Sequence, residues 1–309
     1  MKKLARKKIY SNEIYLNSKL TIDLSITKVY VIADVPYEEN HWTRVFKFND
    51  QLYVARCTQT KSPSKVLNVI IESNKKHDPS VEDRILDTLR YELGLDETMK
   101  ALKREAKKDL LIDLAVRNNP GFRIFANVNA IEVVILTMIS QNTSFFSYLE
   151  LATNFVKTYG EAVPWDKKLR LFPTNEVIAN MKVEDWKKIG LSYKAKYLAN
   201  LTEEDLVNIE TFAYYPILKR GLAKLKEIKG IGDYTARCLT TYHSRRYEYP
   251  IYDTYVQEVL QHKYGVQGFN NMRNYDNWIG KKWKKDPALI LHALMQDYLP
   301  AFLKTRDYE

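Results

Sequence analysis

Residues 222–256 read LAKLKEIKGIGDYTARCLTTYHSRRYEYPIYDTYV, and this stretch decides the fold. Apolar residues in its first third recur at helical spacing and indicate an amphipathic helix that ends near Lys229. Gly230, Ile231 and Gly232 follow, and the pattern predicts a second helix directly after them. Two glycines around one apolar residue permit a very tight turn between two helices. The stretch therefore predicts a helical hairpin.

The predicted turn has the chemistry of an anion site. Ile231 is expected to lie between the two helices, while the backbone N–H groups of Gly230 and Gly232 point outward without helical partners. These groups, together with the positive end of the second helix dipole, form a site of the size of a phosphate. Lys229 adds a positive charge. An ordinary tight corner between two helices is the alternative interpretation.

Asp253 follows Gly232 by 253 − 232 = 21 residues, inside the segment PIYDTYV. A glycine hairpin followed at this distance by an aspartate resembles the helix-hairpin-helix (HhH-GPD) base-excision DNA glycosylases. In that superfamily the aspartate caps a helix at the mouth of the base pocket. Further segments resemble the superfamily in the same order, so we expect the resemblance to cover about residues 93–300: LGLD at 93–96, PGFR at 120–123, ISQNTS at 139–144 and GLSYKAKY at 190–197.

The resemblance implies an enzyme of base excision repair. Such an enzyme binds duplex DNA that contains a damaged base, flips that base out of the stack, and hydrolyses its N-glycosidic bond. A polar side chain fills the vacated space, and either Gln141 or Asn142 stands at that position here. The residues expected to contact DNA are Lys229, Gly230, Ile231, Gly232, Gln141, Asn142 and Lys194.

Asp253 is the candidate catalytic residue. Hydrolysis of a glycosidic bond builds positive charge on the sugar. A nearby carboxylate stabilises that charge, most strongly where water is excluded, and it can activate the attacking water. A simple helix N-cap is the alternative role for Asp253, and both roles are compatible because capping holds the carboxylate in place.

Tyr234 decides the subclass that the resemblance implies. Bifunctional members, which also act as lyases, carry a nucleophilic lysine two residues after the second glycine, where this chain has Tyr234. We therefore expect a monofunctional enzyme that uses water. The segment GIGDYTA is similar to the 3-methyladenine (alkylbase) branch, in which an aromatic wall suits cationic alkylated bases. Trp278 and Trp283 resemble the segment that lines the base pocket, although Trp283 could equally be a core residue.

The predicted fold class is α+β, with an antiparallel β-rich domain at residues 1–100 and a larger all-α glycosylase domain at residues 101–309. A hairpin is expected at residues 43–57, around a turn at Asn49 and Asp50, because both arms alternate with period two. The other segments expected in the first domain are strands at residues 26–35 and 65–72 and a helix at residues 81–93. Helical periodicity runs from residues 102–115 to residues 288–299.

The net charge of +10 and the pI of about 9.2 suit a polyanionic partner. Two cysteines are too few for an iron–sulfur cluster, and no stretch approaches the ~20 apolar residues of a membrane span. We expect an intracellular monomer located with the DNA, without metal or cofactor apart from a monovalent cation that the hairpin carbonyls could hold. The alternative functions are an 8-oxoguanine-type glycosylase/lyase, a non-catalytic DNA-binding protein, and a helical protein whose basic surface has no role.

Overall fold

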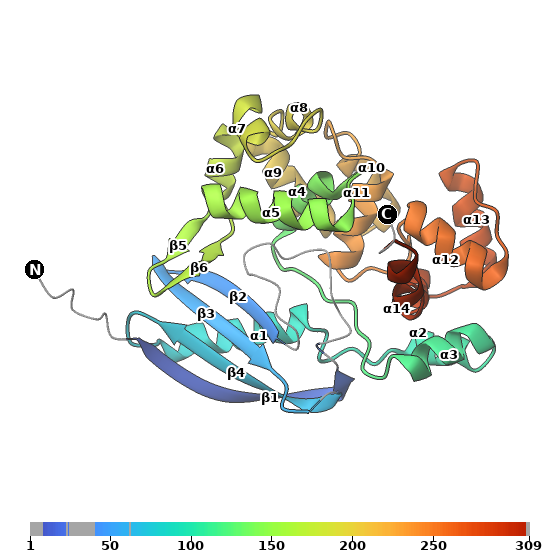
Figure 1. Ribbon diagram of the computed structural model, residues 1–309, viewed down its shortest axis with the longest axis horizontal. Coiled ribbons are helices and arrows are strands. Elements are labelled where there is room, and N and C mark those ends of the chain that lie inside the picture. Colours follow the sequence, from blue (N-terminus) through green and yellow to red (C-terminus); the bar gives the residue numbers. More distant parts are fainter. Residues whose placement is uncertain (1–8, 23, 25–40, 62, 307–309) are drawn as a thin grey trace, which may run out of the picture.

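The computed structural model describes residues 9–22, 24, 41–61 and 63–306. Its first part is a four-stranded antiparallel sheet with the strand order β1-β4-β3-β2, which confirms the predicted fold class (Figure 1). The strand expected at residues 26–35 lies outside the described residues, and the first strand was not predicted. The strands are β1 (Tyr10–Ile22), β2 (His41–Phe48), β3 (Gln51–Thr58) and β4 (Ser64–Ser73).

The predicted hairpin is confirmed, and the structure gives its register. Asn49 and Asp50 form the two-residue loop between β2 and β3, and both have positive φ angles, 48° and 57°. This conformation matches the right-handed twist of the two strands, and asparagine and aspartate tolerate it better than most residues. Phe48 therefore pairs with Gln51 directly beside the loop.

Each face of the sheet is covered by a different element. Helix α1 (Pro79–Glu92) packs Ile85 and Leu89 onto one face, against strand residues such as Leu67. The small hairpin of β5 (Glu161–Val163) and β6 (Asp166–Leu171) packs onto the other face (Figure 1). This second hairpin was not predicted, because its strands are short and rich in charged residues.

The rest of the chain is a helical body in which α4 (Ala130–Ser140) is buried along almost its whole length (Figure 1). The helical segment expected at residues 102–115 is divided into two helices, because Asp109 caps the start of the second one. No helix among the described residues is both long and apolar enough to cross a membrane. The other helices are α2 (Lys100–Ala106), α3 (Leu110–Asn118), α5 (Phe145–Tyr159), α6 (Asn175–Asn180), α7 (Val183–Lys188), α8 (Ala195–Leu198), α9 (Glu203–Ala213), α10 (Leu218–Leu225), α11 (Asp233–Tyr242), α12 (Thr254–Tyr264), α13 (Met272–Lys282) and α14 (Pro287–Arg306).

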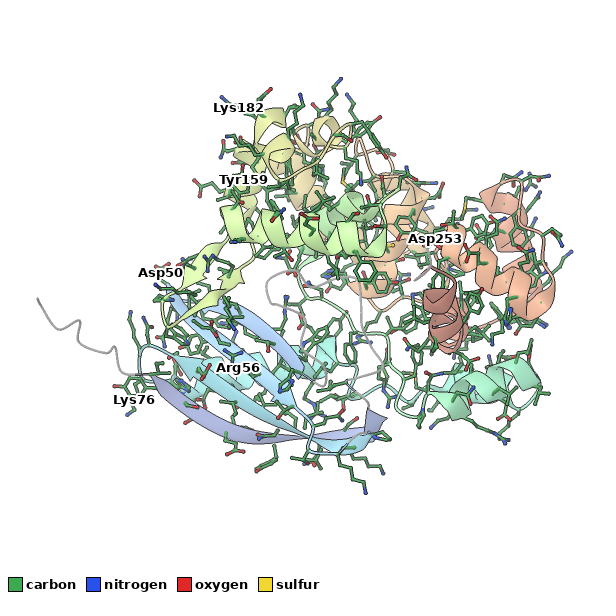
Figure 2. All side chains as sticks on the ribbon, viewed as in Figure 1. Asp50, Arg56, Lys76, Tyr159, Lys182 and Asp253 are labelled. Atoms are coloured by element: carbon green, nitrogen blue, oxygen red, sulfur yellow. The ribbon has the colours of Figure 1, made fainter. Side chains whose placement is uncertain are left out.

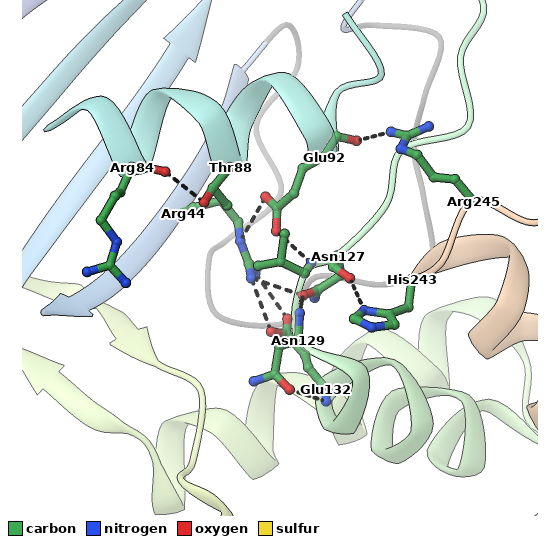
Figure 3. Close-up of polar contacts among 10 residues, drawn as sticks. Arg44, Arg84, Thr88, Glu92, Asn127, Asn129, Glu132, His243 and Arg245 are labelled. Atoms are coloured by element: carbon green, nitrogen blue, oxygen red, sulfur yellow. Dashed lines mark hydrogen bonds and ion pairs between the residues drawn. The ribbon is translucent and has the colours of Figure 1, made fainter. Parts of the chain in front are cut away.

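A buried ionic cluster joins the sheet to the helical body (Figure 3). Arg44 of β2 donates to both carboxylate oxygens of Glu132 on α4, at 3.1 and 3.2 Å. Its Nε lies 3.3 Å from a carboxylate oxygen of Glu92 at the end of α1. Burial raises the pKa of Glu92, while the charge of Arg44 opposes that rise. One guanidinium thus ties together three elements that are far apart in the sequence.

Arg245 makes a second junction between the same two regions. It follows α11, has a positive φ of 51°, and donates to the backbone carbonyls of Tyr91 at 2.9 Å, Glu92 at 2.8 Å and Ile124 at 3.0 Å. In addition, Phe125 packs in the core of the sheet. Packing contacts and hydrogen bonds thus join residues on either side of residue 100. The division into two domains at that residue stays a prediction.

We expect Arg44→Ala to destabilise the fold by about 3–5 kcal/mol, because it leaves two buried carboxylates without their cation. The free energy of unfolding from urea denaturation at neutral pH measures this loss. Arg117→Ala is the matched control, since its ion pair with Asp113 is on the surface and should contribute about 0–1 kcal/mol. Equal losses in the two variants would contradict the prediction.

Candidate active site

The glycine turn lies between α10 and α11, as predicted. Gly230 has a φ of +97°, a conformation that side chains disfavour. A Cβ there would lie 2.9 Å from the Cε of Met138 and 3.0 Å from the Cβ of Tyr197. Both the backbone conformation and the close approach of neighbours therefore require glycine at this position.

The outer side of the turn is open. Gly232 is the exposed N-cap of α11, and a Cβ there would meet no atom within 4 Å. Ile231 is buried between the helices, and Lys229 is exposed beside them. Lys226 and Asp233 form an ion pair of 2.9 Å across the turn. The start of α11 thus has no side-chain cap, and the exposed Gly232 leaves open space beside it.

Asp253 is the N-cap of α12, and its carboxylate accepts the N–H of Val256 at 2.8 Å. It lies half-buried at the start of the helix (Figure 2). Cys238 raises the pKa of Tyr234 on α11, and burial raises the pKa values of Cys238 on α11 and Tyr275 on α13. The negative charge of Asp253 adds to all three rises. The carboxylate is therefore half-buried and interacts electrostatically with side chains of two other helices.

Burial raises the pKa of the Asp253 carboxyl above the ordinary value of an aspartic acid. Hydrogen bonds from the backbone N–H groups of Val256 and Tyr255 oppose this rise, and the negative charge of Glu258 adds to it. Among the described residues, no lysine or arginine forms an ion pair with Asp253. The ionised carboxylate is thus poorly compensated, which favours interaction with a positive charge that develops nearby.

Tyr234 connects the hairpin to Asp253. It lies in the first turn of α11, two residues after Gly232, and its side chain is half-buried. Tyr234 and Cys238 stand one helical turn apart, and the pKa of Tyr234 is raised by Cys238, by burial and by the charge of Asp253. The helix that carries the open turn therefore also forms one wall beside the carboxylate.

Gln141 and Asn142 occupy different environments at the end of α4. Gln141 is half-buried and donates its side-chain amide to the Thr235 hydroxyl on α11 at 2.8 Å. Asn142 is exposed, has a positive φ of 48°, and donates to the Tyr193 hydroxyl at 3.0 Å. The structure thus brings both residues to the hairpin side of the molecule, and Asn142 is the more accessible of the two.

Lys194 does not lie at the surface where a DNA contact was expected. Only 7% of it is exposed, and its ammonium group donates to the carbonyls of Ile139 at 2.7 Å and Gln141 at 2.6 Å and to the Thr143 hydroxyl. In this arrangement the charge satisfies carbonyls at the end of α4 and is not presented to a phosphate. Lys194 thus holds the segment that carries Gln141 and Asn142.

Trp278 and Trp283 are not brought together with Asp253. Trp283 is 2% exposed and packs against Trp278 and Tyr264, with ring centroids 5.8 and 5.9 Å away. Tyr264 is the last residue of α12, whereas Asp253 caps its start, and 11 helical residues span about 16 Å. Trp283 is thus a core residue of the α12–α13 contact, which was the alternative interpretation.

Sequence reasoning missed three residues near Asp253. Cys238 could have been found from its spacing, one turn after Tyr234 on the same helix face. Tyr275 and Arg237 gave no signal, because their contacts join segments that the chain order does not connect.

No group of three or more His, Cys, Asp or Glu side chains in the described part of the chain could hold a metal ion. The expected lack of a cofactor, apart from the monovalent cation, stays a prediction.

Fold and site together define a class: two helices joined by a glycine turn, followed by an aspartate that caps a later helix beside them. This is a helix-hairpin-helix protein with a candidate glycosylase site. Residues 135–285 match the family model described as HhH-GPD superfamily base excision DNA repair protein. Residues 135–285 therefore resemble this superfamily. No curated protein matches it in sequence.

Solved structures share the fold over nearly the whole chain. The 3-methyladenine DNA glycosylase of Archaeoglobus fulgidus is 18% identical, with a TM-score of 0.77 over 94% of this chain and 99% of that one. The 8-oxoguanine glycosylase/lyase of Clostridium acetobutylicum, in complex with DNA containing cytosine opposite 8-oxoguanine, is 16% identical. Its TM-score is 0.73 over 94% of this chain and 98% of that one. At these identities the likeness shows the fold, including the N-terminal sheet, and leaves the substrate open.

We expect Gly230→Ala and Gly232→Ala to differ in their effect on stability. At Gly230 the new methyl group meets Met138 and Tyr197 and the φ is unfavourable, so we expect a loss of about 2 kcal/mol or more. At Gly232 the methyl group meets nothing, and only the poorer N-cap preference of alanine, about 1 kcal/mol or less, remains. Thermal unfolding of the two variants measures both effects, and an equal or larger loss at Gly232 would contradict this assignment of the turn.

Proposed function

We propose that the protein is a monofunctional DNA glycosylase that flips a damaged, alkylated base out of duplex DNA and hydrolyses its N-glycosidic bond. The observation that carries this proposal is the position of Asp253. Its carboxylate is half-buried, has no ion-pair partner among the described residues, and lies beside the helix that starts at the glycine turn. A DNA backbone held at the turn would therefore pass next to a carboxylate.

The turn supports the binding of duplex DNA. Gly232 and the first amides of α11 face open space, and Lys229 stands beside them, so a phosphate group can approach without steric hindrance. Such contacts hold the backbone without reading the sequence. Two similar structures, the Clostridium enzyme and a 3-methyladenine DNA glycosylase of Schizosaccharomyces pombe (17% identical, TM-score 0.51 over 65% of this chain and 97% of that one), are complexes with DNA.

Asp253 supplies the chemistry in this proposal. As the bond to the base breaks, positive charge develops on the sugar, and the ionised carboxylate stabilises it. The same group can orient and deprotonate the water that attacks the sugar carbon. Asn142, which is exposed, or the half-buried Gln141 would fill the space that the base leaves. We propose that the enzyme works as a monomer located with the DNA.

Tyr234 supports hydrolysis without a lyase step. A lyase step needs an amine nucleophile, and position 234 carries a phenol whose pKa is raised further by Cys238, burial and Asp253. The ammonium group of Lys194 is buried and occupied by three acceptors. The aromatic ring of Tyr234 also supports an alkylated base as substrate, because a cationic base is attracted to a π face.

Base release from duplexes with single defined lesions tests the proposal. We expect the wild-type protein to release an alkylated base such as 3-methyladenine under single-turnover conditions. The rate should rise with pH as Asp253 ionises, and the midpoint should lie above the ordinary aspartate pKa because burial raises it. Asp253→Asn should lower the rate at least a thousandfold, about 4 kcal/mol of transition-state stabilisation, while duplex binding stays within about twofold of wild type.

Borohydride separates this proposal from a glycosylase/lyase that acts on 8-oxoguanine. Incubation of the protein with lesion-containing DNA and borohydride should yield no covalent adduct, because no Schiff base forms. A trapped adduct, or full activity in Asp253→Asn, would contradict the proposed mechanism. Release of 8-oxoguanine without an adduct would keep the hydrolytic mechanism and overturn the substrate.

We also expect Asp253→Asn to stabilise the fold at neutral pH. The folded protein holds the Asp253 proton at pH values where the unfolded chain has lost it, so stability falls as the pH rises from the ordinary aspartate pKa through the raised value, and stays lower above it. Asparagine keeps an oxygen for the Val256 N–H and cannot ionise.

The free energy of unfolding in urea, compared at about pH 7 and about pH 4, measures this effect. The gain of Asp253→Asn should be present at the higher pH and shrink at the lower one. Asp78→Asn is the matched control, because Asp78 caps α1 in the same way but is exposed, and it should bring no gain. A loss of stability in Asp253→Asn at neutral pH would show that capping outweighs burial.

A further inference from the structure

The segment directly before Asp253 is held by two other helices. Arg237 of α11 donates through Nη1 to the carbonyl of Pro250 at 3.0 Å. Tyr275 of α13 donates its hydroxyl to the carbonyl of Ile251 at 2.7 Å. Two consecutive carbonyls are therefore fixed by two different helices, two or three residues before the carboxylate.

Both donors are held firmly in place. Arg237 and Asp276 form a bidentate ion pair, with Nη1–Oδ1 at 2.7 Å and Nη2–Oδ2 at 2.8 Å, and Arg237 is 4% exposed. Such parallel hydrogen bonds fix the plane of the guanidinium as well as its distance. Tyr275 is fully buried, with its ring 4.6 Å from that of Tyr252, the residue next to Asp253.

We propose that Arg237, Asp276 and Tyr275 are positioning residues for the glycosylase reaction, which fix the place of the Asp253 carboxylate relative to the glycine turn. This inference rests on the proposed function. Arg237 stands on the helix that begins at Gly232, about one and a half turns from it, so the helix that holds the DNA backbone also sets the entry to the carboxylate. A single helix, α11, therefore connects the proposed DNA-binding turn to the segment that precedes the carboxylate.

The position of the Asp253 carboxylate is expected to affect the rate of the proposed reaction. A carboxylate that stabilises a developing charge must lie close to the sugar, and a displacement of about 1 Å can lower the rate about a hundredfold. Backbone φ and ψ angles before an N-cap are free to vary unless neighbouring groups restrict them. Hydrogen bonds to the two carbonyls of Pro250 and Ile251 restrict them here, and α12 fixes the other side through the Val256 N–H.

Asp276→Asn and Tyr275→Phe test the proposal, because each removes one contact and keeps the size of the side chain. Asp297→Asn is the matched control. Asp297 forms an ion pair of 2.7 Å with Lys263, which joins α14 to the end of α12 that lies away from residues 250–253. The three variants are expected to lose similar amounts of thermal stability, so a difference between them in other measurements reports on Asp253.

Hydrogen exchange of the full-length protein without DNA is the first measurement. We expect the amides of the first turn of α12 to exchange about tenfold faster in Asp276→Asn and Tyr275→Phe, and at the wild-type rate in Asp297→Asn. This result needs no substrate, so it tests the positioning even if no lesion is cleaved. Wild-type exchange in all three variants would overturn the proposal, whereas failure of wild-type protein to release any base would overturn the proposed function alone.

The single-turnover rate of base release is the second measurement. We expect a loss of about ten- to a hundredfold in Asp276→Asn and Tyr275→Phe, with duplex affinity within about twofold of wild type. The rise of the rate with pH should move to lower pH, because water reaches the loosened carboxylate, which faces Tyr234, Cys238, Tyr275 and Glu258. Rates and pH profiles that match those of Asp297→Asn would show a merely structural role and overturn the proposal.

Discussion

The Asp253 carboxylate is subject to two opposing electrostatic effects, and the candidate site depends on their balance. Burial disfavours its charge, while the backbone N–H groups in the first turn of α12 favour it. A fully solvated aspartate would be held by water as well as by the protein and would stabilise a positive charge weakly. A fully buried one without N–H partners would keep its proton. The N-cap position gives an intermediate state, in which the group can ionise and still interact strongly with a nearby cation.

This balance has consequences for the rest of the fold. A carboxylate whose pKa is raised lowers the stability of the folded state at neutral pH, and the open turn with a glycine at φ +97° adds no stability of its own. The contacts that offset these costs lie elsewhere. Arg44 and Arg245 connect the sheet to the helical body through buried carboxylates and backbone carbonyls, and they do not touch Asp253. The stability that these two junctions contribute offsets the unfavourable charge at the site.

The parts of the site that follow from local chemistry could be predicted from the sequence, and the parts that depend on tertiary contacts could not. Gly230 indicates a tight turn because its positive φ and its close neighbours exclude a side chain, and the period-two alternation around Asn49 predicts the β2–β3 hairpin. Lys194 looked like a surface lysine, but the carbonyls that bind it come from a segment about 55 residues earlier. A tryptophan suits a pocket wall as well as a protein core, so the identity of Trp283 alone could not predict which of the two it occupies. The β5–β6 strands were hidden by their charges, which pair across to the sheet, as Arg56 does with Asp166 at 2.8 Å.

Position 234 shows how one fold can support different chemistry. The first turn of α11 brings whatever side chain stands there to the carboxylate at the start of α12, because the glycine turn and the Arg237 contact to Pro250 fix the two helices relative to each other. An amine at this place could attack the sugar carbon, and a carboxylate beside it could accept its proton. The phenol of Tyr234 offers no such amine, which is why we propose that the carboxylate acts on water. The same backbone geometry thus allows either reaction, and the side chain at residue 234 supports the proposed hydrolysis.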